Sequence, residues 1–156
     1  MTAFAGWLSQ TALSLTIQTH EWVIPTIQSI HIVAIGVALV SAFMIGFRVL
    51  GWTGSDQTLA ETTARFWPWL VASLGVLLVT GALMVAGEPA RELLALSFWL
   101  KMILVVVGTT LTWWVSRRGT KPLTILTLLV WVGIIFLGRL IAYDHIWGAW
   151  SMSPKA

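Results

Sequence analysis

The segment Ile27–Leu50, IQSIHIVAIGVALVSAFMIGFRVL, decides the fold of this 156-residue chain. It contains no Asp, Glu, Lys or Arg before Arg48. A transmembrane helix takes about 20 apolar residues at about 1.5 Å each, so this segment is long enough to cross a bilayer. It also carries His31, at a depth where an imidazole needs a partner or a ligand because hydrocarbon offers no hydrogen bonds.

The composition extends this interpretation to the whole chain. Hydrophobic residues make up 58% of it and charged residues 10%, against about 25% charged in soluble proteins. The absence of cysteine excludes disulfides, Cys-ligated metal sites and covalent haem attachment. We therefore predict a single membrane domain over residues 1–156, with the lipid bilayer as its main partner.

Polar and glycine-containing breaks divide the chain into four apolar segments. They predict spans at about 23–50, 66–87, 94–116 and 123–143. Residues 4–19 are too polar to span and predict an interfacial helix. The predicted fold class is thus an all-α membrane protein, an antiparallel bundle of four transmembrane helices with a short N-terminal interfacial helix.

The basic residues predict the orientation. The ends of spans one and three and the starts of spans two and four carry Arg48, Arg65, Arg117, Arg118 and Lys121. The positive-inside rule then places both termini on the periplasmic side of a bacterial inner (plasma) membrane. No basic patch is interleaved with exposed aromatic residues, so we expect no nucleic-acid partner.

The candidate site residues gather on the expected outer side of the bundle. They are His20, His31, Lys101, Arg139, Tyr143 and His145. His20 and His31, eleven residues apart, are predicted to share one helix face. Arg139 and Tyr143 form an i, i+4 pair.

Each of these residues also has a simpler interpretation. Lys101 and Arg139 lie within about one turn of the interface, where long cationic side chains snorkel toward water. His20 and His145 fit exposed or interfacial positions better than ligand positions. A structural hydrogen bond of His31 to Gln28 or to a backbone carbonyl remains open, although its depth favours a functional role.

Three motifs resemble the CopD and HemJ-type proteins, small bacterial membrane proteins of which HemJ is a haem-b-binding protoporphyrinogen oxidase. They are IHIVAIGV…GFRVLG around His31, Trp67-Pro68 leading into LLVTGALM, and FWLKMILVV around Lys101, within residues 28–116. The resemblance implies that His31 and Lys101 are functional positions. It also implies a further histidine on span three, where this chain has Thr112 and Trp113, so bis-histidine haem ligation between spans one and three is not expected. A haem would then need His31 with a weaker or vacant sixth position, or a pair of ligands drawn from His20 and His145 near the outer surface.

Three functions follow from these observations. The first is haem b binding for electron transfer, with His31 as axial ligand, Lys101 and Arg139 on the propionates, Tyr143 as hydrogen-bond donor and a periplasmic redox partner. The second is handling of copper or another soft metal by His31, His20 and His145, although no Met-rich motif accompanies them. The third is a cofactor-free accessory subunit that packs against other membrane subunits. A HemJ-like oxidase activity is left open.

Overall fold

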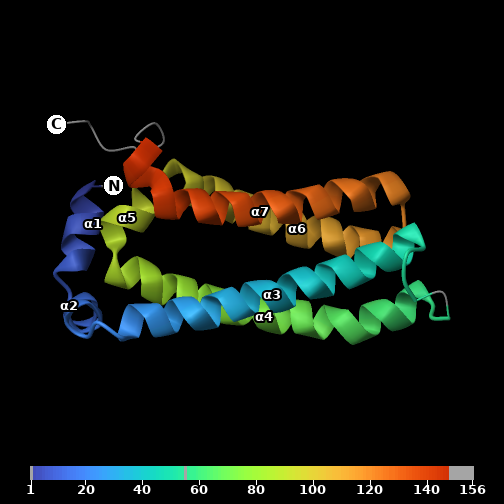
Figure 1. The fold of residues 1–156 in the computed structure, drawn as a ribbon, viewed down its shortest axis with the longest axis horizontal. Helices are drawn as coiled ribbons and strands as arrows, with labels where there is room; N and C mark the ends of the chain where they lie inside the picture. The colour runs from blue at the N-terminus through green and yellow to red at the C-terminus, as the bar shows by residue number, and fades with distance from the viewer. Residues whose placement is uncertain (1, 55, 148–156) are drawn as a thin grey trace.

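The structure is a computed structural model that describes residues 2–54 and 56–147, with side chains up to residue 139. Within these ranges the chain forms only helices: α1 (Thr2–Ser9), α2 (Ala12–Thr19), α3 (Val23–Leu50), α4 (Leu59–Gly87), α5 (Pro89–Leu93), α6 (Leu96–Arg118) and α7 (Lys121–Trp147). The four long helices run side by side as an antiparallel bundle (Figure 1). The predicted all-α bundle is confirmed.

The outer surface of this bundle is strongly apolar. Helices α3, α4, α6 and α7, the last up to Arg139, are each long and apolar enough to cross a membrane. Large side chains such as Leu78 and Phe136 are 75% and 69% exposed on them. Lipid is the environment in which such surfaces are stable, so the chain is a multi-pass membrane protein.

Two helix pairs build the bundle. Helix α3 packs along α4, and α6 packs along α7 (Figure 1). The pairs meet in a core of Ala38, Ala42, Leu70, Trp131 and Ile134. The two alanines are 1% and 2% exposed, and their small side chains let the neighbouring helices approach closely.

Helix α4 begins earlier than the sequence pattern predicted. It starts at Leu59 rather than near 66, because Thr58 and Glu61 form a capping box that satisfies the first backbone N–H groups. Pro68 therefore lies inside the helix and not at its entry. The polar connection after α3 is correspondingly shorter than expected.

The predicted interfacial helix 4–19 is wrong in its continuity. It is two helices: α1 ends at Ser9, and Thr11 caps the start of α2 by accepting a hydrogen bond from the backbone N–H of Ser14. The short helix α5 replaces an expected loop, with Pro89 in its first turn. Helices α1, α2 and α5 lie together at one end of the bundle, which we call the α5 end (Figure 1).

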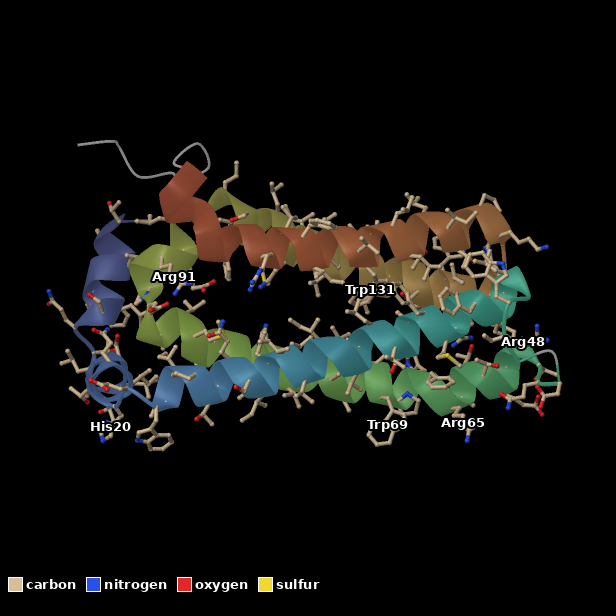
Figure 2. All side chains as sticks on the ribbon, in the orientation of Figure 1. His20, Arg48, Arg65, Trp69, Arg91 and Trp131 are labelled. Atoms are coloured by element: carbon tan, nitrogen blue, oxygen red, sulfur yellow. The ribbon has the colours of Figure 1, made fainter. Side chains whose placement is uncertain are left out.

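A buried hydrogen bond joins α6 to α7. Trp131 lies between the two helix pairs (Figure 2) and its Nε1–H donates to Thr112 Oγ1 at 2.9 Å, while the Thr112 hydroxyl donates to the Gly108 carbonyl at 2.7 Å. This bond explains a tryptophan in the middle of a span, where its N–H has no water.

Replacing Thr112 by valine keeps the shape of the side chain and leaves the indole N–H without an acceptor. We expect Thr112→Val to lower the free energy of unfolding by about 1 kcal/mol. Thr110→Val is the matched control, because that hydroxyl makes the same bond to its own helix but is exposed. Thermal unfolding in detergent, followed by circular dichroism, checks this, and equal melting temperatures for the two variants would contradict it.

Candidate functional site

His31 lies on the inward face of α3. Ile27, Ala34 and Ala38, at helical spacing around it, are all buried, and His31 itself is half-buried. Its Nδ1 is 2.7 Å from the Thr80 Oγ1 of α4. The ring also lies beside Gly81, where a Cβ would be 3.7 Å from the imidazole Cε1. The partner of His31 is therefore on α4, and neither Gln28 nor a backbone carbonyl.

The neighbours of Thr80 indicate how the imidazole is protonated. The Thr80 hydroxyl donates to the Val76 carbonyl at 2.7 Å, as threonines inside helices commonly do. A hydroxyl has one hydrogen, so Oγ1 serves His31 as an acceptor and Nδ1 carries the ring proton. Among the residues with described side chains, none hydrogen-bonds to Nε2. A lone pair on Nε2 is thus available for a ligand.

Lys101 faces the same part of the bundle from α6. It lies one turn after the buried Ser97, and a Cβ at Gly138 of α7 would be 3.7 Å from its Cδ. Its side chain is half-buried and its charge acts on both His31 and Glu92. Lys101 is therefore near enough to His31 for its charge to act on the imidazole.

Arg139 follows Gly138 on α7 and has an exposed side chain. Tyr143 and His145 belong to the helical backbone of α7, but their side chains lie outside the described residues. The C-terminal part of α7, which carries these three residues, lies at the α5 end (Figure 1).

The prediction that His20 shares a helix face with His31 is wrong. Helix α3 begins at Val23, and His20 ends α2 with an extended backbone. Its Nδ1 is 2.9 Å from the Thr16 carbonyl oxygen and the side chain is exposed (Figure 2). Within the described ranges no group of three His, Cys, Asp or Glu residues is placed to hold a metal ion.

Glu92 is a site residue that the sequence did not reveal. It was expected in a solvated loop with Glu88 and Arg91, which do form an exposed ion pair. Glu92 instead is 6% exposed, and burial raises the pKa of its carboxyl against the opposing charges of Lys101 and Arg91. Pro89 could have indicated a helix here, but the burial of Glu92 depends on how α1, α4 and α6 pack against α5, which no local pattern encodes.

The raised pKa of Glu92 links protonation to stability. The folded chain binds this proton more tightly than the unfolded chain, so the stabilisation is complete below the ordinary pKa of 4.5 and is lost as pH rises through the raised value. Between the two values the free energy of unfolding should fall by at most about 1.4 kcal/mol per pH unit.

Thermal unfolding in detergent across this pH range measures the effect. We expect Glu92→Gln to flatten the pH dependence, and the control Glu88→Gln, in the exposed ion pair, to keep it and move it only slightly to lower pH, because the Glu88 charge is the smallest of the causes acting on Glu92. The reverse pattern would contradict the assignment of the raised pKa to Glu92.

Comparison of the chain with models of protein families, with curated proteins and with solved structures found no match in any of the three. The resemblance to CopD and HemJ-type proteins therefore stays a prediction from the motifs around His31, Trp67 and Lys101. The function has to be argued from the arrangement of His31, Thr80 and Lys101.

Proposed function

We propose that this protein is an integral membrane haem b protein for electron transfer, with His31 as an axial ligand through Nε2. The site lies toward the α5 end of the bundle. Lys101 and Arg139 hold the propionates, and Tyr143 is a candidate hydrogen-bond donor to the same groups. When bound, the haem supplies one-electron redox chemistry at its iron.

The hydrogen bond between His31 and Thr80 carries this proposal. A histidine that ligates a metal through one nitrogen almost always donates the other N–H to a fixed acceptor, which sets the tautomer and the orientation of the ring. The 2.7 Å contact to Thr80 Oγ1 is such a bond, and it leaves the lone pair on Nε2. The donor set of this site thus fits one axial ligand.

The charges around His31 fit a dianionic ligand. Lys101 supplies a cation from α6 on the inward face of the bundle, and Arg139 follows Gly138, over which the Lys101 stem lies. Ionised groups inside a membrane protein are costly and usually pair with a counter-charge. The carboxylates of a cofactor would meet that need for Lys101.

A second axial ligand from α6 has no support. The position suggested by the resemblance is occupied by Thr112, whose hydroxyl accepts from Trp131, and by Trp113, which is exposed. The proposal is therefore a haem with one histidine ligand, and the bis-histidine arrangement of a purely electron-carrying cytochrome does not enter it.

Localisation is part of the proposal. Arg48 and Arg65 lie at the end of the bundle opposite to His20 (Figure 2), and Arg117, Arg118 and Lys121 belong to the same end by the order of the helices. By the positive-inside rule that end faces the cytoplasm. The α5 end and both termini would then face the periplasm of a bacterium, with the redox partner on that side.

The cofactor-free alternative uses the same hydrogen bond in another way. A bond between His31 and Thr80 also ties α3 to α4, as expected of an accessory subunit packed in a larger membrane complex. The copper alternative gains nothing from the structure, since His20 is turned away from His31 to its own helix. Spectroscopy separates these possibilities.

The direct test is the absorption spectrum of the protein purified from cells supplied with haem. We expect a Soret band in the native protein and a loss of at least about tenfold in that band per mole of His31→Ala. His20→Ala is the control and should keep the band. A colourless native protein that is isolated only with partner subunits would overturn the haem proposal in favour of the accessory one.

The acceptor of the His31 N–H gives a finer test. Thr80→Val removes the hydroxyl without changing the shape of the side chain, and we expect it to weaken haem binding by about 10- to 100-fold. Thr80→Ser keeps an acceptor and should bind haem nearly as the native protein does. Haem titration of the apoprotein measures both, and equal affinities for the two variants would contradict the role given to this bond.

A further inference from the structure

Glu92 is a buried carboxyl without an ion pair in the described part of the chain. It is 6% exposed, whereas Glu88, the residue just before the same short helix, forms the exposed ion pair with Arg91. The charge of Lys101 acts on Glu92, but no ion pair joins the two side chains. An isolated buried carboxylate is costly, and binding a proton is the usual way to remove that cost.

The surroundings of Glu92 are largely uncharged. Helices α1, α4 and α6 pack against α5. Helix α1 carries no charged residue, and the last turn of α4 carries none before Glu88. The charged groups that act on Glu92 are Lys101 from α6 and Arg91 and Glu88 from its own segment.

A second buried polar group belongs to the same region. Ser97 is 2% exposed, and its hydroxyl has no hydrogen-bond partner in the described structure. It lies one helical turn before Lys101 on the inward face of α6. Thr63 is also buried and without a partner, but it lies on the first turns of α4, at the opposite end. Ser97 differs from Thr63 in its position: in the sequence it stands between Glu92, which is buried, and Lys101, which is half-buried.

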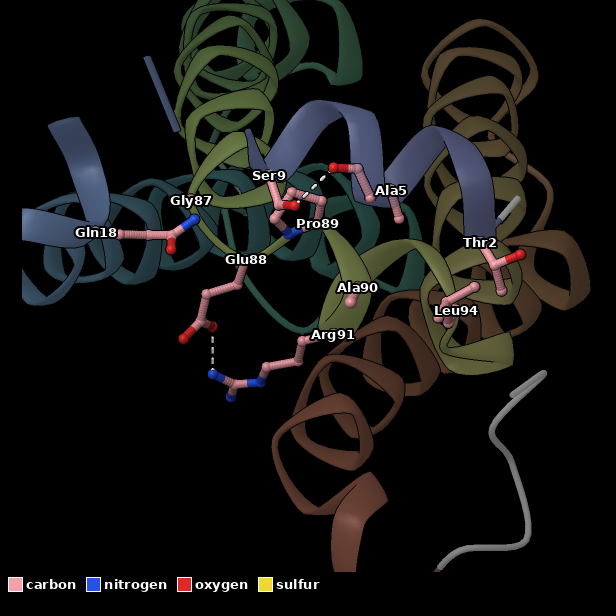
Figure 3. A pocket seen from close by; sticks show the side chains of 11 residues that line it. Thr2, Ala5, Ser9, Gln18, Gly87, Glu88, Pro89, Ala90, Arg91 and Leu94 are labelled. Carbon is pink, nitrogen blue, oxygen red and sulfur yellow. Dashed lines mark hydrogen bonds and ion pairs between the residues drawn. The ribbon is translucent and has the colours of Figure 1, made fainter. Parts of the chain in front are cut away.

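An open groove gives water access to this segment. It lies between α1, α2 and α5, has a volume of about 490 Å³, and is lined by small residues that include Gly6, Gly87 and Ala90 (Figure 3). Glu88 and Arg91 stand at its edge and are joined there by their ion pair (Figure 3). Solvent therefore reaches one face of the helix that carries Glu92, while Glu92 itself lies behind the residues that line the groove.

We propose that the buried Glu92 carboxyl, with Lys101 as its charged neighbour and the unpartnered Ser97 hydroxyl nearby in the sequence, is a proton-binding site that exchanges with the aqueous phase at the α5 end. A hydronium ion from the aqueous phase gives its proton to a carboxylate oxygen of Glu92 and leaves as water. The reverse step returns the proton to water. This site needs no haem, so it goes beyond the function proposed above.

Proton binding at this site changes the charge next to His31. Ionised Glu92 offsets the positive charge of Lys101, and protonated Glu92 leaves that charge uncompensated. An anionic ligand held by Lys101 would then be bound more tightly at low pH. The site thus provides a link between the pH at the α5 end and the interior of the bundle.

Infrared difference spectroscopy of the haem-free protein in liposomes tests the proposal. The C=O stretching band of a protonated carboxylic acid should persist above the pH at which exposed glutamates have ionised, and should shift in D₂O because the proton exchanges. The band should be absent in Glu92→Gln and kept in Glu88→Gln. Its loss in Glu88→Gln instead, or its absence from the native protein, would overturn the proposal.

Three further variants define the neighbours and guard against misfolding. Lys101→Met should raise the pH at which the band disappears, because the cation favours the ionised carboxyl. Ser97→Ala should shift the frequency of the band, and an unchanged frequency would remove Ser97 from the site. Glu92→Asp keeps the carboxyl and should keep a band at a changed frequency, and an unaltered band there would assign it to another residue. None of these outcomes depends on whether haem binds.

Discussion

Inside a bilayer a polar group has no water to bond with, so each one needs a partner within the protein. Most threonines and serines of the spans meet this need by donating to the carbonyl three or four residues earlier, as Thr80 and Thr112 do. A hydroxyl used in this way still has lone pairs to accept a hydrogen bond from another helix. In the part of the chain with described side chains, two hydrogen bonds between side chains join neighbouring spans, from His31 to Thr80 and from Trp131 to Thr112. In both, the acceptor is a threonine hydroxyl that already donates to its own helix.

The same requirement separates the features that could be predicted from the sequence from those that could not. Spans, their number and their antiparallel order follow from apolar length and basic ends, which are properties of single segments. Helix ends depend on caps that short sequence patterns encode. The capping box of Thr58 and Glu61 could have predicted that α4 begins at Leu59, and the cap at Thr11 could have predicted a break in the N-terminal helix. Thr80 could not have been found as the partner of His31, because it depends on how α3 and α4 are rotated against each other.

The burial of Glu92 could not be predicted from its local sequence either. Two carboxyls and an arginine within five residues look like a solvated turn, and for Glu88 and Arg91 that is correct. Glu92 is buried because α5 packs against helices that are distant in the sequence, which no local pattern reveals. The prediction that His20 and His31 share a helix face is wrong for a local reason. It requires residues 20–22 to continue α3 as a helix, and the backbone is extended at His20.

The two proposals rest on different groups and meet at Lys101. In the haem site this cation is the counter-charge of a bound anion, and in the proton site it opposes the burial of Glu92. A single cation cannot fully compensate two negative charges. An anion bound at Lys101 would therefore reduce the electrostatic stabilisation that Lys101 gives to ionised Glu92. Binding of an anion at Lys101 should therefore favour proton uptake by Glu92. By linkage, proton uptake by Glu92 should favour anion binding to the same extent. The arrangement of one cation between a buried carboxyl and an imidazole is thus sufficient, without any movement of the helices, to make ligand binding in the bundle depend on the pH outside it.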